Sequence, residues 1–234
     1  MSAFKDQIGR GIIVSCQLDE TEPLHSPQHC ALFAQAAEAG GAVAVRGEGI
    51  QNIQEIRATT RIPLIGCTRA AYDDGWMLVT PDMPAVDQLV RLGVDVIALD
   101  ATTRVRPNGL DGTRFVADVR KRHPEQLILA DISTFEEGVR AADVGASAVS
   151  TVLCGRTKET YEHSLSVSPN LDLVYRLATT IGIPVLAEGF IWSPADAAQS
   201  MESGAYAVVV GGAITRPRVI TQLFVSAVDT SVVR

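Results

Sequence analysis

The stretch IPVLAEGFIWSP, residues 183–194, decides the fold that this sequence predicts. It begins with a short, branched, apolar run that has the composition of a buried strand. It ends with Ser-Pro, a pair that commonly begins a helix. Between the two parts lie a carboxylate, Glu188, and a glycine, Gly189. A strand that passes through a few residues into a helix is the repeating unit of parallel α/β proteins.

Seven similar apolar runs occur elsewhere in the chain. Their apolar residues are continuous, which predicts strands that are buried on both faces, as in a parallel sheet. Together with the opening stretch, the predicted strands cover residues 11–16, 42–46, 62–67, 94–100, 127–131, 148–153, 183–188 and 206–211.

A helical pattern follows each predicted strand. Ser26 and Pro27 begin the first helix and Gly40 ends it, while Thr134 and Glu137 have the spacing of a capping box. The predicted helices cover residues 26–41, 50–60, 84–93, 112–123, 134–145, 171–182, 193–204 and 217–228.

The number and regularity of these units predict the architecture. Eight strand–helix units in 234 residues, with no long linker, fit a single (β/α)8 TIM-barrel domain that spans residues 1–234. A doubly wound open sheet is the alternative. That fold would need a glycine-rich phosphate loop after an early strand, and no such loop is visible.

Composition limits the class of function. A net charge of -7 argues against a nucleic-acid-binding protein, and 47% hydrophobic residues describe a compact globule. No apolar stretch approaches the roughly 20 residues that a membrane span needs, and the N-terminus lacks the apolar core of a signal peptide. The four cysteines form no CxxC pair and are expected to be reduced thiols. We therefore expect a cytoplasmic protein with no nucleic-acid or membrane partner.

In a barrel of this class, polar residues at the carboxyl ends of the strands are candidates for catalysis and binding. Any one carboxylate could instead pair with a neighbouring arginine or cap a loop, and this alternative is strongest for Asp100. The strands end at Gln17, Arg46, Arg69, Asp100, Asp131, Ser150 with Thr151, and Glu188.

The last two units carry a second signal, which points to phosphate. Gly189, Gly211 and Gly212 would let backbone N–H groups approach an anion near the start of a helix, and Arg216 could add a charged side chain. Loops after the seventh and eighth strands commonly hold phosphate in such barrels. The alternative is that these glycines only make tight turns. No His, Asp or Glu spacing indicates a metal site.

These residues lie in strings that resemble the N-acetylmannosamine-6-phosphate 2-epimerases, bacterial enzymes of sialic-acid and amino-sugar breakdown. The most specific strings are AVVVGGAITRP (207–217), ADIST (130–134) and AEG (187–189), and all matching strings together span residues 11–224. The resemblance implies a barrel isomerase that needs no metal or nucleotide cofactor. Its substrates would be N-acetylmannosamine 6-phosphate and N-acetylglucosamine 6-phosphate, which differ in configuration at C2.

The resemblance also implies roles for individual residues. Gln17, Arg46, Asp131 and Glu188 would surround the sugar, with Glu188 in a catalytic role. Ser150 and Thr151 fall in a matching VST string and are assigned to substrate binding. The segments at 189 and 211–216, including Arg216, would hold the phosphate.

One departure from the family pattern concerns the principal catalytic residue. After the third strand the family reads like IGIIKRDY, and its lysine is catalytic, whereas this chain reads IGCTRAAY (65–72) and has Arg69 at that position. An arginine has a pKa above 12 and hardly ever loses its proton. Arg156 replaces a tyrosine of the family after the sixth strand, and Phe190 replaces a common arginine.

Three interpretations of Arg69 remain open at this point. In the first, Arg69 stabilises an enolate or orients the sugar while Glu188 or Asp131 moves the proton. In the second, Lys158 serves as a replacement base. In the third, the chain no longer acts on this substrate. Our leading hypothesis is a phosphosugar 2-epimerase. The alternatives are a non-catalytic phosphosugar-binding protein and an epimerase of a related amino-sugar phosphate. Barrels often form homodimers, and nothing in the sequence locates the interface.

Overall fold

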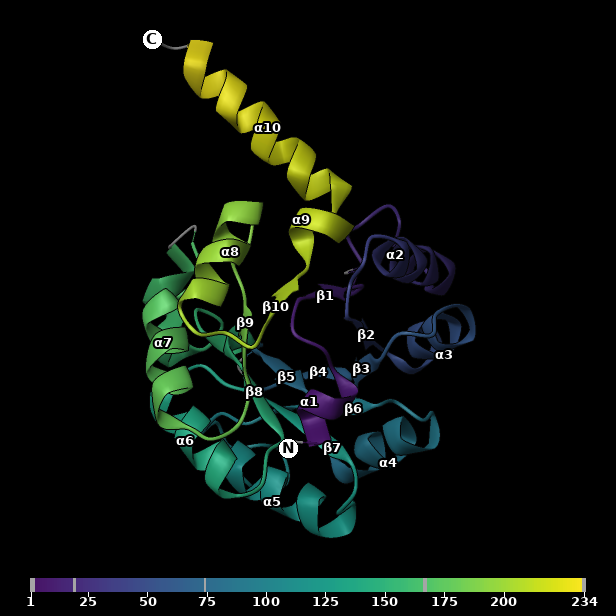
Figure 1. Ribbon diagram of the computed structural model, residues 1–234, viewed down its shortest axis with the longest axis vertical. Coiled ribbons are helices and arrows are strands. Elements are labelled where there is room, and N and C mark those ends of the chain that lie inside the picture. The colour runs from purple at the N-terminus through teal and green to yellow at the C-terminus, as the bar shows by residue number, and fades with distance from the viewer. Residues whose placement is uncertain (1–2, 19, 74, 166–167, 233–234) are drawn as a thin grey trace.

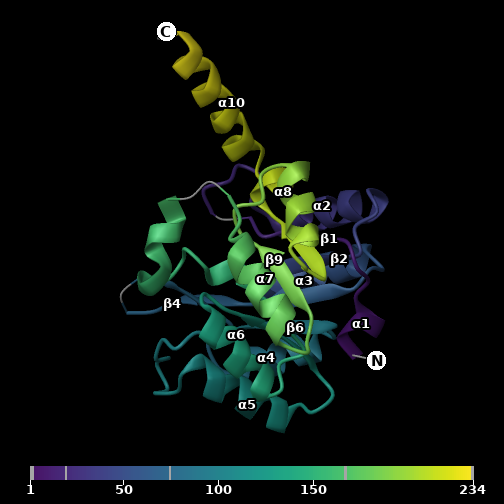
Figure 2. The ribbon, with the colours of Figure 1, turned by 60° about the vertical axis from the view of Figure 1, so that its left-hand side comes forward.

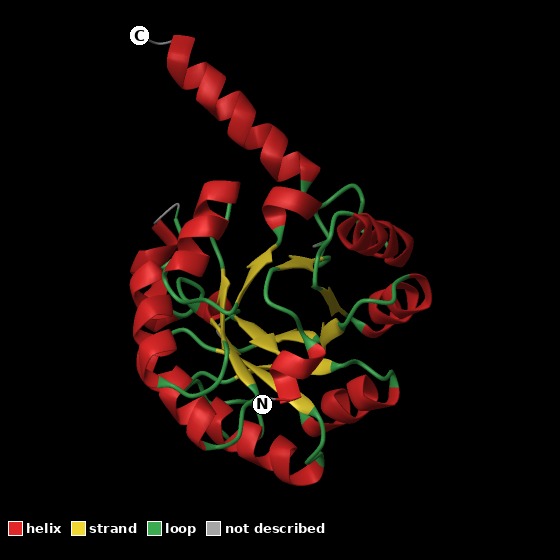
Figure 3. Cartoon of the chain, viewed as in Figure 1, coloured by secondary structure: helices red, strands yellow, loops and turns green. Residues whose placement is uncertain are grey.

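Eight parallel strands form a closed barrel in the computed structural model, which describes residues 3–18, 20–73, 75–165 and 168–232 (Figures 1 and 3). The order around the barrel is β1-β10-β9-β8-β7-β6-β3-β2, with β2 closing onto β1. The barrel strands are β1 (Ile12–Ser15), β2 (Ala44–Glu48), β3 (Leu64–Cys67), β6 (Val96–Asp100), β7 (Leu127–Asp131), β8 (Ala148–Ser150), β9 (Val185–Glu188) and β10 (Ala207–Val210). Each predicted strand overlaps one of them, although β2 continues to Glu48, past the predicted end at 46, and the predicted (β/α)8 fold is confirmed.

Helices surround the barrel on its outside (Figure 3). Each predicted helix is present, and the predicted capping box of Thr134 and Glu137 is formed. The helices after the barrel strands are α2 (Pro27–Ala39), α3 (Ile50–Thr59), α4 (Met83–Arg91), α5 (Gly112–Arg122), α6 (Phe135–Asp143), α7 (Leu171–Thr180), α8 (Pro194–Glu202) and α10 (Pro217–Val232).

The barrel has a packed interior. Branched and small side chains such as Ile65, Leu129 and Leu186 fill its centre. The short helix α1 (Ala3–Gln7) adds Phe4, and Ile8 follows it, so that apolar side chains from the N-terminal segment join the same cluster. A second buried layer lies between the strands and the outer helices. Within the described residues, the inside of the barrel is therefore filled below the strand ends. A ligand inside the barrel would have to bind at one of its two ends.

The strand register brings the expected polar residues together. Asp100 of β6 lies opposite Asp131 of β7, and Asp131 lies opposite Ser150 of β8. On β9, the next strand after β8 around the barrel, Glu188 lies opposite Val209 of β10. Because all the strands run the same way, these residues meet at the carboxyl ends of the strands.

Three local features differ from the prediction. A hairpin of β4 (Arg69–Ala71) and β5 (Met77–Val79) follows β3, so Arg69 lies on a separate two-stranded sheet. The predicted strand 148–153 ends at Ser150, whose side chain accepts a hydrogen bond from Val152 N, and the chain continues as the 3-10 helices η1 (Thr151–Leu153) and η2 (Lys158–Leu165). A short helix, α9 (Gly212–Thr215), separates β10 from α10.

Helix α10 leaves the barrel. In two views that differ by 60°, the helix extends outward from α9 and its C-terminal part lies far from the other elements (Figures 1 and 2). In the described part of the chain, no helix has both the length and the apolar character of a membrane-crossing segment.

Candidate functional site

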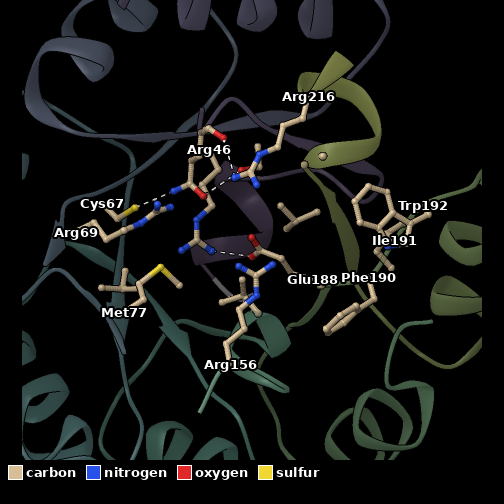
Figure 4. Close-up of a pocket in the computed structure, with 18 of the residues that line it drawn as sticks. Arg46, Cys67, Arg69, Met77, Arg156, Glu188, Phe190, Ile191, Trp192 and Arg216 are labelled. Atoms are coloured by element: carbon tan, nitrogen blue, oxygen red, sulfur yellow. Dashed lines mark hydrogen bonds and ion pairs between the residues drawn. The ribbon is translucent and has the colours of Figure 1, made fainter. Parts of the chain in front are cut away.

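A cavity opens at the carboxyl ends of the barrel strands (Figure 4). Four arginines line it, Arg46, Arg69, Arg156 and Arg216, together with the carboxylate of Glu188. The predicted site residues that line the cavity are Gln17, Arg46, Arg69, Glu188, Gly189, Gly211, Gly212 and Arg216. The other three predicted residues, Asp131, Ser150 and Thr151, are buried directly beneath and contact residues of its wall.

Arg46 joins two carboxylates at the floor of this cavity. Its Nη2 donates to Oδ2 of Asp131 over 2.5 Å, and its Nη1 donates to Oε2 of Glu188 over 2.7 Å. The side chain of Arg46 is 2% exposed and that of Asp131 is fully buried. Charge-assisted hydrogen bonds of this length in a buried setting hold all three groups in one geometry.

Glu188 is held on one side and open on the other. Its Oε2 also accepts from Ser150 Oγ at 2.7 Å, and Thr151 Oγ1 bonds both the N–H and the carbonyl of Glu188. Its Oε1 accepts no hydrogen bond from any residue that the structure describes. One carboxylate oxygen is therefore fixed while the other is available to a molecule in the cavity.

Asp131 has an unusual protonation equilibrium. The pKa of Asp131 is raised to about 7. Burial is the main cause, Arg46 opposes it, and the nearby charges of Glu188 and Asp100 add to it. Asp131 does not line the cavity, and its carboxylate accepts hydrogen bonds from Arg46, which does. Its geometry is that of a positioning group.

Arg69 forms an ion pair with Glu48. Its Nη2 lies 2.6 Å from Oε2 of Glu48, and the two side chains are 32% and 19% exposed. Burial raises the pKa of Glu48, while the charges of Arg69 and Arg46 lower it. Arg69 therefore lines the cavity as a cation whose charge is partly balanced by the carboxylate of Glu48.

The hairpin that carries Arg69 is tied to the barrel through Asp100. This buried carboxylate accepts hydrogen bonds from Arg104, from Thr102 and from the hydroxyl of Tyr72, which follows β4. Asp100 does not line the cavity. The structural alternative, pairing with a neighbouring arginine, therefore describes Asp100 correctly.

Glycines and Arg216 form the end of the cavity next to α9. A Cβ atom on Gly212 would lie 3.1 Å from the ring of Trp192, so a larger residue would press against that ring. Gly189 has a φ of 106°, a conformation that side chains rarely adopt. Arg216 Nη2 donates to the carbonyl of Gln17 at 3.4 Å. Backbone N–H groups and a guanidinium on one wall suit an oxyanion such as a phosphate.

Two positions that depart from the family pattern also face the cavity. Phe190 has a φ of 59°, which is rare for a bulky residue, and its ring meets His163 edge to face at 5.3 Å. Desolvation lowers the pKa of Arg156, and the charge of Glu188 opposes that effect. Lys158 begins η2, is exposed and does not line the cavity, so its position gives no support to a role as the replacement base.

Sequence reasoning missed several lining residues and one charged partner. Glu48 follows Arg46 by two residues on β2, and such residues point to the same side of a strand, so this spacing was the available signal. Trp192, Met77 and Val79 form apolar parts of the wall, and nothing in the sequence separates them from ordinary core residues. Among the described residues, no cluster of His, Cys, Asp and Glu is arranged to hold a metal ion.

Comparison with known proteins identifies the family. Residues 30–230 match the family model described as "Putative N-acetylmannosamine-6-phosphate epimerase". Two similar proteins are named "Putative N-acetylmannosamine-6-phosphate 2-epimerase". The one from Caldanaerobacter subterraneus is 44% identical to this chain, and the match covers 94% of this chain and 92% of the relative. The one from Clostridioides difficile is 41% identical, and the match covers 96% of this chain and 98% of the relative. The structure of the N-acetylmannosamine-6-phosphate 2-epimerase from Clostridium perfringens is 42% identical, covers 94% of each chain and superposes with a TM-score of 0.86. The chain therefore belongs to the N-acetylmannosamine-6-phosphate 2-epimerase family.

Proposed function

We propose that this chain is an isomerase that inverts C2 of N-acetylmannosamine 6-phosphate to give N-acetylglucosamine 6-phosphate, as part of amino-sugar breakdown. The observation that carries the proposal is the way in which Glu188 is hydrogen-bonded at the cavity wall. This carboxylate is held through Oε2 by Arg46 and Ser150, and Glu188 lines a cavity that is rich in arginine. A fixed carboxylate with one open oxygen is suited to remove a proton from carbon.

The reaction needs a base, a proton donor and a stabilising charge. Once the sugar ring opens to the aldehyde, the proton on C2 is acidified by the adjacent carbonyl. Glu188 takes that proton, and the electron pair moves into the carbonyl to form an enolate. A water molecule from solvent then gives a proton to the opposite face of C2, and the hydroxide that it leaves takes the proton held by Glu188, which restores both the water and the carboxylate. Arg69 and Arg46 stabilise the enolate oxygen, since both lie on the cavity wall as permanent cations.

The remaining residues hold the substrate in this scheme. Gly189, Gly211, Gly212 and Arg216 bind the phosphate, while Gln17 contacts the sugar. Ser150 and Thr151 act on Glu188, through its side chain and its backbone respectively. Asp131 orients Arg46 and does not touch the sugar. A cytoplasmic location remains a prediction, in keeping with four buried, unpaired cysteines.

The test follows the C2 proton directly. N-acetylmannosamine 6-phosphate is incubated with the protein in D₂O and observed by ¹H NMR. Loss of the C2 signal with appearance of the gluco epimer is the expected result. A C2 signal that persists, while added substrate still binds as judged by calorimetry, would contradict the proposal and leave a phosphosugar-binding protein. Turnover of another N-acyl-hexosamine phosphate alone would move the assignment to a related substrate.

A further inference from the structure

Arg156 differs from the other three arginines that line the cavity. Arg46, Arg69 and Arg216 each donate to an oxygen atom of another residue. The guanidinium of Arg156 forms no ion pair and no hydrogen bond with any residue that the structure describes. Its hydrogen-bond donors are therefore available to a molecule in the cavity.

The surroundings of Arg156 require that such a molecule supply an acceptor. The residue is exposed to the cavity, but protein atoms surround it closely enough that desolvation lowers its pKa. Glu188 opposes that effect, and the charges of the other three arginines add to it. A ligand that fills the cavity displaces water from the guanidinium. Binding is then weakened unless the ligand replaces the hydrogen bonds of that water.

The backbone that carries Arg156 is held on both sides. Arg156 N donates to the carbonyl of Leu153 at 2.9 Å, and Gly155 N donates to Thr160 Oγ1 at 2.9 Å. The hydroxyls of Thr157 and Thr160 lie 2.8 Å apart and share a hydrogen bond. The side chain of Arg156 therefore begins from a fixed position on the wall, which lowers the entropic cost of binding a ligand.

The position of Arg156 decides which part of the substrate it meets. Figure 4 shows the guanidinium groups of Arg156 and Arg216 on opposite sides of the Glu188 carboxylate. In the proposed reaction the phosphate on C6 binds at Arg216 and C2 lies at Glu188. The groups beyond C2, as seen from the phosphate, are the oxygen on C1 and the N-acyl group. Arg156 therefore faces this end of the substrate.

The wall beside Arg156 favours the N-acyl group over the oxygen on C1. Phe190 and Val152 line the cavity together with Arg156. The ring of Phe190 packs on the segment that carries Arg156, since a Cβ atom on Gly155 would lie 3.2 Å from that ring. A cation next to an aromatic face suits a group with both a polar oxygen and an alkyl part, as an acyl group has.

We infer that Arg156 and Phe190 form the subsite for the N-acyl group of the substrate, an inference that rests on the proposed function. We further infer that this subsite accepts acyl groups that end in a carboxylate and binds them more tightly than acetyl. The carbonyl of an acetyl group accepts a hydrogen bond from the guanidinium but leaves its charge unbalanced. A carboxylate accepts two charge-assisted hydrogen bonds and balances that charge.

The first test measures binding without turnover. The probes are the alditols of N-acetylmannosamine 6-phosphate and N-malonylmannosamine 6-phosphate, which cannot form the aldehyde that acidifies C2. Calorimetry should show that the N-malonyl alditol binds the unchanged chain about tenfold more tightly than the N-acetyl alditol. Arg156→Gln should remove this difference. Since the guanidinium has no partner in the described structure, the variant is expected to fold normally, which circular dichroism checks.

The matched control is Arg69→Gln, which removes another cation from the same cavity. It should weaken the binding of both alditols by a similar factor and preserve the ratio between them. A ratio that Arg69→Gln abolishes as fully as Arg156→Gln would assign the preference to the overall charge of the cavity and overturn the subsite. Equal binding of the two alditols to the unchanged chain, or no binding of either, would overturn it as well.

The second test uses kinetics and separates this inference from the proposed function. Arg156→Gln should raise the KM for N-acetylmannosamine 6-phosphate more than it lowers kcat, because Arg156 binds the acyl group and not the reacting atoms. A dominant loss of kcat would contradict the subsite. The expected ratio of affinities without loss of the C2 proton in D₂O would refute the proposed function and retain the subsite. Epimerisation with a ratio that Arg156→Gln leaves unchanged would do the reverse.

Discussion

The guanidinium of Arg69 lies 2.6 Å from the carboxylate of Glu48, across the wall of the cavity. The resemblance noted in the sequence implies a lysine in the family where this chain has Arg69, and a lysine can give up its proton when its surroundings lower its pKa. An arginine that is paired with a carboxylate stays charged. We therefore assign Arg69 to the stabilisation of negative charge and expect proton transfer to take place elsewhere.

Substitution of Arg69 tests this assignment. Arg69→Met should reduce kcat by about 10²–10³-fold, the usual cost of removing one group that stabilises an oxyanion. Arg69→Lys should retain much more activity because the charge is kept. The measurement is the initial rate of epimerisation in each variant. If Arg69→Met had unchanged kcat, position 69 would have no part in the chemistry.

Glu188→Gln addresses the base itself. The amide keeps the shape of the side chain but cannot accept the C2 proton at neutral pH, so kcat should fall by about 10²–10⁴-fold. Deuterium incorporation at C2, read by NMR, should fall with it. Glu55→Gln, on an exposed position of α3, is the control and should retain full activity. Full activity in Glu188→Gln would remove this residue from the mechanism.

The pH dependence of the reaction should reflect Asp131. Its pKa is raised to about 7, so in the folded chain it is protonated below that pH, where an ordinary aspartate is ionised. Protonation of Asp131 removes its ion pair with Arg46, so Arg46 is held less firmly in the geometry that positions Glu188. We therefore expect kcat/KM to fall as the pH is lowered through about 7.

Asp131→Asn separates this explanation from others. The amide is neutral at every pH, so the dependence near pH 7 should disappear and kcat/KM should stay low throughout. A variant with the same pH profile as the unchanged protein would assign the dependence to a different group. The full profile of kcat/KM between pH 5 and 9 provides the comparison.

Much of the fold could be predicted because each strand and helix has a local signal. The run at 183–188 is apolar and branched, and Ser193 with Pro194 begins α8 as expected. The β4–β5 hairpin had no such signal, since its strands have three residues each and its attachment depends on Tyr72 and Asp100, which are far apart in sequence. Short elements that are stabilised by distant contacts are not visible in local patterns.

The candidate site was predictable to a similar extent, and for a related reason. Strand ends of a parallel barrel meet, so Arg46 and Glu188 could be placed together before their contact was known. How deeply each side chain lies below the cavity could not be derived in this way. Asp131 lies behind Arg46 and does not line the cavity, because side-chain packing at the strand end decides which group faces the cavity.

A pair of glycine substitutions tests how closely α5 packs on β6. A Cβ atom on Gly112, the first residue of α5, would lie 2.5 Å from Cα of Ala101 and 2.6 Å from the carbonyl oxygen of Thr102. Both obstacles are backbone atoms, so they cannot move aside as a flexible side chain would. Gly112→Ala should therefore lower the free energy of unfolding by about 3 kcal/mol, the upper end of the usual cost of overpacking.

The matched control is Gly182→Ala, in the turn before β9. A Cβ atom there meets nothing within 4 Å, so the free energy of unfolding should change by less than about 1 kcal/mol. Urea unfolding of both variants, followed by circular dichroism at a fixed protein concentration, gives the comparison. The fixed concentration matters because association of chains would itself contribute to stability. Equal stability of the two variants would mean that α5 can shift away from Ala101, and that the strand ends are held less rigidly than the hydrogen bonds of Asp100 indicate.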